Sequence, residues 1–163
     1  MATKIEDALD IIKGMKAGLK AATGGGKVLV TYTQDWDDVS KAKEAAFGQI
    51  SQGATAIVPY LDNGIVGVVQ ALGEKGKYAL SVLQDLGKTK PDVNLISVVT
   101  SWPEAILSFV KLAKEGKAER KDYRFSIGSK PLQVGIVNPK AASLLQADID
   151  QILADVKAGK LKF

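Results

Sequence analysis

Residues 27–60, KVLVTYTQDWDDVSKAKEAAFGQISQGATAIVPY, decide the fold, because two β-branched segments flank a helical one. Residues 27–33 and 54–60 are short runs rich in Val, Thr and Ile, which predict two strands. Residues 38–53 predict the helix between them, with Asp38 as its N-cap. The apolar face of this helix is formed by Ala42, Ala45, Ala46 and Ile50. Strand, helix and strand in this order predict a parallel β-α-β unit.

The same alternation continues on both sides of this unit. Further helices are predicted over residues 4–21, 64–73, 101–116 and 139–158, and further strands over 77–83, 93–99 and 123–137. Apolar strands separated by amphipathic helices favour a sheet covered on both faces. We therefore predict an α/β fold: a three-layer αβα sandwich around a five-stranded, mostly parallel, flavodoxin-like sheet in the order 2-1-3-4-5. No linker or compositional break interrupts the sequence, so a single α/β domain over residues 1–163 is expected.

Composition narrows the chemistry. The sequence contains no Cys and no His, which removes thiolate nucleophiles, disulfides and the commonest metal ligand. A net charge of +4, with the Lys residues scattered, is typical of a solvated surface and does not predict nucleic-acid binding. The first 22 residues lack the apolar core of a signal peptide, and no stretch reaches the roughly 18 apolar residues of a membrane span. We expect a soluble protein as given, without membrane insertion and without a cofactor or a metal.

The predicted carboxyl ends of the strands hold the candidate ligand-binding residues. In an open α/β sheet, ligands bind beyond these ends, and aromatic faces beside carboxylates suit a flat heterocycle or a sugar. The candidate residues are Trp36, Asp38, Tyr60, Asn63, Gly64, Asp85 and Trp102. A purely structural role is the alternative for these residues. Asp38 and Ser101 could act as helix caps, and both Trp residues could anchor their loops.

Other sites are disfavoured by the same loops. Gly24-Gly25-Gly26 precedes a strand instead of following one, and the first predicted strand is followed by QDWDD, whose carboxylates repel a phosphate. The pattern of a receiver domain is incomplete at Asp85 and Thr100. Asp35, Asp37 and Asp38 could together hold Mg²⁺, but neighbouring carboxylates in a turn are more typical of a helix cap.

Several short motifs resemble one family. Asp38, Gly53-Ala54-Thr55, Asn63-Gly64, Tyr78-Ala79-Leu80-Ser81, Ser97-Val98-Val99 and the closing segment Asp155–Lys162 match its pattern in order. The chain is thus identified as similar to the second lobe of the basic membrane protein family, the purine-nucleoside-type substrate-binding lipoproteins of ABC transporters within the type I periplasmic-binding-protein superfamily. The resemblance implies a non-enzymatic solute-binding lobe whose parent family is periplasmic or extracellular. It also implies a small nucleoside-like or sugar-like ligand.

Two departures from the family pattern bear on the ligand. Leu83 stands where the family places an acid, so that Asp85 is the one acid that remains of that motif. Thr100 stands where the family places a lysine. A full member is about twice this length and closes two lobes over its ligand. We therefore expect weak or lost ligand affinity. We also expect a homodimer formed through the exposed rim, the set of strand-end loops that carries Trp36, Tyr60 and Trp102. The alternatives are an engineered flavodoxin-like scaffold without a ligand and, as a third hypothesis, an enzyme that uses the acidic rim.

Overall fold

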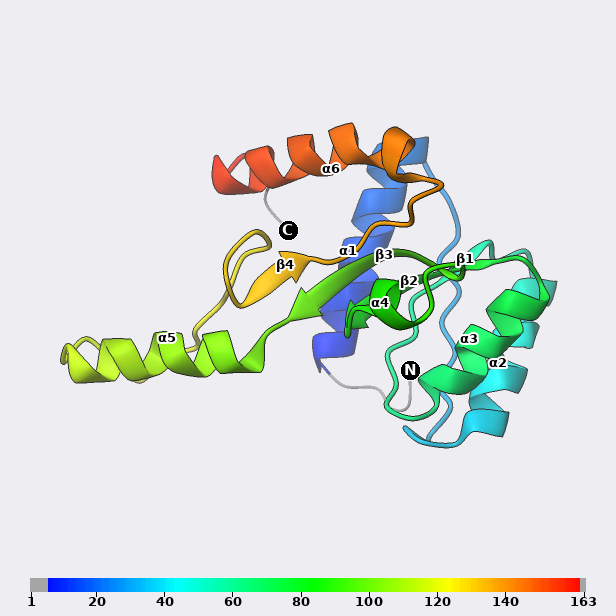
Figure 1. Cartoon of the computed structure of the whole chain (residues 1–163), viewed down its shortest axis with the longest axis horizontal. Helices are drawn as coiled ribbons and strands as arrows, with labels where there is room; N and C mark the ends of the chain where they lie inside the picture. The colour runs from blue at the N-terminus through cyan, green and yellow to red at the C-terminus, as the bar shows by residue number, and fades with distance from the viewer. Residues whose placement is uncertain (1–5, 162–163) are drawn as a thin grey trace. The chain divides into compact units, whose positions relative to one another are not determined.

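The computed structural model describes residues 6–161, and the side chains of residues 8–161. Its helices are α1 (Glu6–Thr23), α2 (Val39–Ser51), α3 (Ile65–Glu74), α4 (Leu86–Thr89), α5 (Trp102–Lys114) and α6 (Ala142–Lys157). Its strands are β1 (Ala56–Ile57), β2 (Tyr78–Leu83), β3 (Asn94–Thr100) and β4 (Leu132–Val134). The α/β class is confirmed (Figure 1).

The chain divides into two compact units, the first ending at Leu80 and the second beginning at Ser81. Each unit is described below by itself. The expectation of a single domain over residues 1–163 stays a prediction.

In the first unit, α2 and α3 pack against each other along their length (Figure 1). Ala42 and Ala46 of α2 are buried, as their helical spacing predicts. On α3, Gly67 permits the close approach, since a Cβ at this position would lie 2.0 Å from the carbonyl oxygen of Val39. Leu72 is fully buried and anchors the other end of α3 in the core. Small residues at the crossing thus bring the backbones of these two helices together.

The sheet is four-stranded within the described residues, in the order β1-β2-β3-β4, so the prediction of five strands is wrong by one. The missing strand is 27–33, which forms no strand in the structure. β1 pairs directly with β2 in parallel, Ala56 opposite Tyr78, and this pairing takes the place that the order 2-1-3-4-5 gave to 27–33. Side chains hold the segment instead: Gln49 Nε2 donates to Thr31 Oγ1 at 3.1 Å.

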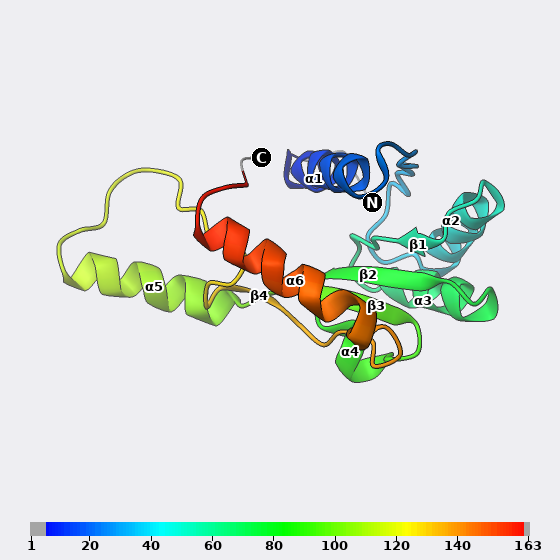
Figure 2. The same cartoon turned by 90° about the horizontal axis from the view of Figure 1, so that it is seen from above.

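In the second unit, β3 pairs antiparallel with β4, with Val98 opposite Val134. The short helix α4 lies beside β3 (Figure 2). No helix was predicted at α4, and of the strand predicted over 123–137 only Leu132–Val134 forms. A turn at Pro131 and the bridge between Ser129 and Leu132 precede β4, so that only three of the fifteen predicted residues form a strand.

The second unit contains a network of hydrogen bonds between buried polar side chains. Ser81 Oγ donates to Ser97 Oγ at 2.7 Å, and Asn94 Nδ2 donates to the same oxygen at 3.1 Å. Asn138 Nδ2 donates to the carbonyl oxygens of Pro91 at 2.8 Å and Asn94 at 2.9 Å. These four side chains are almost fully buried. The network ties β2, β3 and the segment after β4 together, through Ser81 to Ser97 and through Asn138 to Asn94 and Pro91.

The predicted helices match the observed ones to within about three residues at their ends. Residues 4 and 5 of the first predicted helix, and Lys162 in the closing motif, lie outside the described residues.

Candidate functional site

Two loops of the first unit meet at the ends of α2 and α3. The carbonyl oxygen of Trp36 accepts hydrogen bonds from the backbone N–H of Asp62 at 3.1 Å and of Gly64 at 3.0 Å. We call residues 34–38 and 60–64 the paired loops. Gly64 is required for this approach, since a Cβ would lie 2.9 Å from the Trp36 oxygen. The predicted residues Trp36, Asp38, Tyr60, Asn63 and Gly64 all lie in the paired loops.

The aromatic rings of the paired loops contact each other. Trp36 and Tyr60 have ring centroids 5.8 Å apart and an interplanar angle of 70°, an edge-to-face arrangement. Both residues are partly exposed. Edge-to-face packing holds the rings in a defined orientation while part of their surface stays open to solvent.

The paired loops also contain carboxylates, and one of these was not among the ligand-binding residues predicted from the sequence. Asp37 Oδ1 accepts from the Asn63 side-chain amide at 2.8 Å and from the Asn63 backbone N–H at 3.2 Å. The sequence offered a signal for Asp37, its place in the QDWDD run, but no means of pairing it with Asn63. An exposed acceptor and amide therefore lie in the same two loops as the aromatic rings.

The Asp35 carboxylate stabilises the turn that leads into α2. Its Oδ1 accepts from the backbone N–H of Asp37 at 2.8 Å and of Asp38 at 3.0 Å. These two hydrogen bonds favour the ionised form and hold the pKa of the Asp35 carboxyl below its ordinary value. Gln34, which enters this turn, adopts a left-handed φ of 60°. This conformation is uncommon for a residue with a Cβ and stores strain at the start of the loop.

Asp38 is the N-cap of α2, as the sequence predicted. Its Oδ1 accepts from the backbone N–H of Lys41 at 2.9 Å. Ser101 caps α5 in the same way, through Glu104. A direct ligand contact for Asp38 stays a prediction.

Replacement of Asp38 by Ala is expected to lower the free energy of unfolding by about 1 kcal/mol, because the first turn of α2 loses its side-chain acceptor. Urea titration followed by circular dichroism measures this. Asp62→Ala, in the neighbouring loop, is the matched control. An equal loss in both variants would contradict the capping role.

Asp85 and Trp102 belong to the second unit. Asp85 Oδ1 accepts from the backbone N–H of Gly87 and of Ile136, both at 3.2 Å, and so fixes the start of α4 to the segment after β4. Trp102 opens α5 and is 66% exposed. Whether these two residues share a site with the paired loops stays a prediction.

Within residues 6–161, no group of three or more Asp, Glu, His or Cys side chains is arranged to hold a metal ion. In the same range, no helix has the length and apolar character needed to cross a membrane.

The close approach at Gly64 has a testable consequence. In Gly64→Ala we expect the added methyl to force the paired loops apart, since the carbonyl oxygen it meets belongs to the backbone of Trp36. The expected cost is about 1–3 kcal/mol of unfolding free energy, as for other overpacked sites, with a shift of the Trp36 indole NMR signal. Gly48→Ala is the control, because nothing lies within 4 Å of a Cβ there. An unshifted indole signal in Gly64→Ala would contradict this geometry.

Loops that present aromatic rings and hydrogen-bonding side chains at one end of an α/β unit are typical of small-molecule binding proteins. The sequence matches the family described as ABC transporter substrate-binding protein PnrA-like over residues 2–160. The chain belongs to this family, known as Bmp. The identification made from the short motifs is therefore confirmed.

Individual proteins resemble the chain in sequence or in fold. A purine-binding protein of Brucella abortus is 24% identical over 110 residues, which are 66% of this chain and 31% of that protein. Among solved structures, a transcriptional activator of the comK gene from Bacillus halodurans is 20% identical with a TM-score of 0.77 over 88% of this chain. A solute-binding protein from Conexibacter woesei is 24% identical with a TM-score of 0.65 over 93%. The chain spans about half the length of these two structures, 50% and 51%.

Proposed function

We propose that this chain is a non-enzymatic solute-binding lobe of the Bmp type, and that its paired loops contact a flat, polar ligand such as a nucleoside. The observation that carries the proposal is that the paired loops hold both the Trp36–Tyr60 ring pair and the Asp37–Asn63 hydrogen bond. A ring face stacks on a heterocycle, while a carboxylate and an amide bind hydroxyl and N–H groups. The strained Gln34 supports a functional loop, because backbone strain clusters at binding sites. The family match disfavours the alternative of an engineered scaffold without a ligand.

The affinity of this chain for a nucleoside is expected to be low. Leu83 and Thr100 stand at the positions that resemble charged ligand contacts of the family, and neither side chain carries a charge. Each missing hydrogen bond to a charged group removes about 1.5–3 kcal/mol. A ligand on one lobe also leaves much of its surface in water, while the entropy cost of association remains.

A ligand screen tests the function. Nucleosides and monosaccharides are titrated into the protein while the melting temperature and the NMR signals of the Trp indoles are recorded. A ligand at 100 times its dissociation constant stabilises the native state by about 2.7 kcal/mol. Weak, saturable shifts at Trp36 with a nucleoside or a sugar support the proposal. Saturable binding that leaves Trp36 unshifted would overturn the assignment of the site.

Self-association is the second part of the proposal. Trp36 and Tyr60 of the paired loops are partly exposed. Helix α5 has no buried residue, and it exposes Trp102, Ile106 and Phe109 at positions i, i+4 and i+7. Residues with this spacing lie on one face of a helix. Exposed apolar patches of this kind mark interaction surfaces, and a second copy of the chain supplies a self-complementary patch.

We expect sedimentation velocity to show a dimer that dissociates on dilution, because covering apolar area contributes about 25 cal/mol per Å². Ile106→Lys and Phe109→Lys together should give a monomer at every concentration. Lys111→Glu, on the same helix, is the control that keeps the apolar face. A wild-type protein that is strictly monomeric would contradict the prediction.

A further inference from the structure

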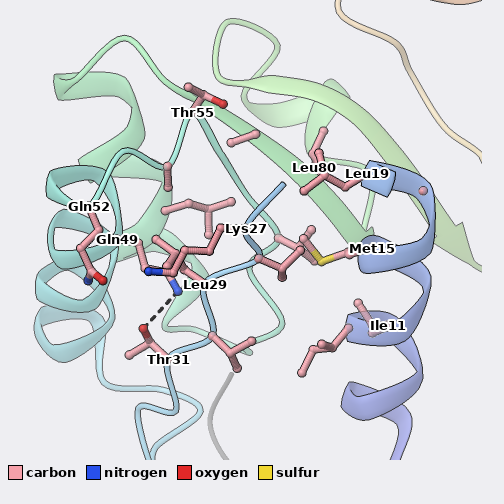
Figure 3. Close-up of a pocket in the computed structure, with 18 of the residues that line it drawn as sticks. Ile11, Met15, Leu19, Lys27, Leu29, Thr31, Gln49, Gln52, Thr55 and Leu80 are labelled. Carbon is pink, nitrogen blue, oxygen red and sulfur yellow. Dashed lines mark hydrogen bonds between the residues drawn. The ribbon is translucent and has the colours of Figure 1, made fainter. Parts of the chain in front are cut away.

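A cavity of about 600 Å³ lies within the first unit, between α1, the segment 27–31 and the residues around β1 (Figure 3). This volume is within the range of about 300–1,000 Å³ that small-molecule sites occupy. The predicted strand 27–33 borders it without pairing in the sheet. The cavity is separate from the contacts between the paired loops, with which it shares only Tyr60.

One wall of the cavity is apolar. Ile11, Met15 and Leu19 project from successive turns of α1 into the space, and Leu29 and Leu80 lie across from them (Figure 3). Their spacing of four residues places the α1 side chains in a row along one helix face. The row forms an elongated apolar surface, which suits a flexible aliphatic chain.

The other wall is polar and carries a positive charge. Lys27 extends towards Gln49 of α2, whose Nε2 donates to Thr31 Oγ1 at 3.1 Å (Figure 3). Lys27 is the one charged side chain among the described residues that line the cavity, and no Asp or Glu is among them. In the described part of the chain no ion pair involves Lys27. A Lys beside apolar surface favours an anionic group on a ligand that is otherwise apolar.

We propose that this cavity is a second ligand site, and that it binds a free aliphatic carboxylate of medium chain length. The chain lies along the α1 row, and the carboxylate meets Lys27 with the Gln49 amide beside it. This site takes a different chemical class from the paired loops and does not depend on the proposed nucleoside function.

Calorimetric titration with dodecanoate, below its micelle threshold, tests the site. We expect saturable binding of one dodecanoate per chain, and affinity that falls about fourfold for each methylene removed in the series to octanoate. That factor corresponds to about 0.8 kcal/mol per buried CH₂. Dodecanol should bind more weakly than dodecanoate, because it carries no charge for Lys27.

Matched variants localise the binding. Gly18 lines the cavity, and nothing lies within 4 Å of a Cβ there, so Gly18→Leu is expected to fit the backbone and to occupy part of the space. Gly14 on the same helix is equally open but is not among the lining residues. Gly18→Leu should abolish dodecanoate binding and Gly14→Leu should retain it. Lys27→Met should weaken dodecanoate binding at least tenfold and leave dodecanol unchanged, with Lys20→Met as the control.

Three results would overturn the proposal. The first is dodecanoate binding that survives in Gly18→Leu, which would show non-specific adsorption. The second is equal loss of binding in Lys27→Met and Lys20→Met, which would show attraction to the net charge alone. The third is binding of anionic phospholipid vesicles without binding of free dodecanoate, which would identify a membrane-surface interaction instead.

Discussion

Replacement of Trp36 by Ala is expected to lower the affinity for a nucleoside by about 5- to 150-fold. This range corresponds to about 1–3 kcal/mol for the loss of one base–aromatic stacking contact. Trp36 also packs edge-to-face on Tyr60, so its removal frees the second ring as well. NMR titration gives the two dissociation constants, and far-UV circular dichroism confirms that the fold is retained.

Two further variants complete this test. Phe125→Ala removes an exposed aromatic ring from the second unit and should leave the affinity unchanged. Trp102→Ala asks whether the second unit contributes to the same ligand, as the sequence predicts. Unchanged affinity in Trp36→Ala would contradict the site in the paired loops, whatever the result at Trp102.

Asn138→Ala is expected to give the largest loss of stability, about 2–4 kcal/mol. The Asn138 side chain is 4% exposed, donates to two carbonyl oxygens and accepts from the backbone N–H of Lys140 at 2.9 Å. The variant leaves the buried carbonyl of Asn94 without this partner and opens a small void. Urea unfolding measures the change through the transition midpoint.

Asn63→Ala is the matched control, since this Asn is exposed and lies in a surface loop. Its expected cost is below about 1 kcal/mol. An equal, small cost at both positions would show that the buried network contributes little to the second unit.

Local chemistry in the sequence predicted the helices well. Asp38 and Ser101 are observed as caps, and the Ala spacing of α2 faces the core, because capping and helical periodicity depend on neighbouring residues only. The parallel pairing of β1 with β2 was predictable from the order strand, helix and strand over 54–60, 64–73 and 77–83, whereas the unit predicted over 27–60 did not form.

The sheet was less predictable, because pairing depends on distant partners. Residues 27–33 have the composition of a strand, yet β1 and β2 pair with each other and 27–33 stays outside the ladder. Strand propensity describes a fit to a half-buried surface and does not specify which strand is the partner. The buried network of Asn94, Ser97 and Asn138 was equally hidden, since each residue alone is ordinary in a loop or on a strand.

The candidate site was predicted in part for the same reason. Strand-end position selected Trp36, Tyr60, Asn63 and Gly64, which the structure places together. It did not select Asp37, whose importance lies in a hydrogen bond to a residue 26 positions away. Residue type and position in the sequence identify which loops carry candidate residues. Which of these residues bond to each other can be seen only in the folded structure.

An amide and indole NMR titration with adenosine tests the central claim most directly, because it detects weak binding and locates it by residue. The account predicts saturable shifts at the Trp36 indole, the Asn63 side-chain amide and the Gly64 backbone N–H. Saturable shifts confined to residues outside 34–38 and 60–64 would contradict it.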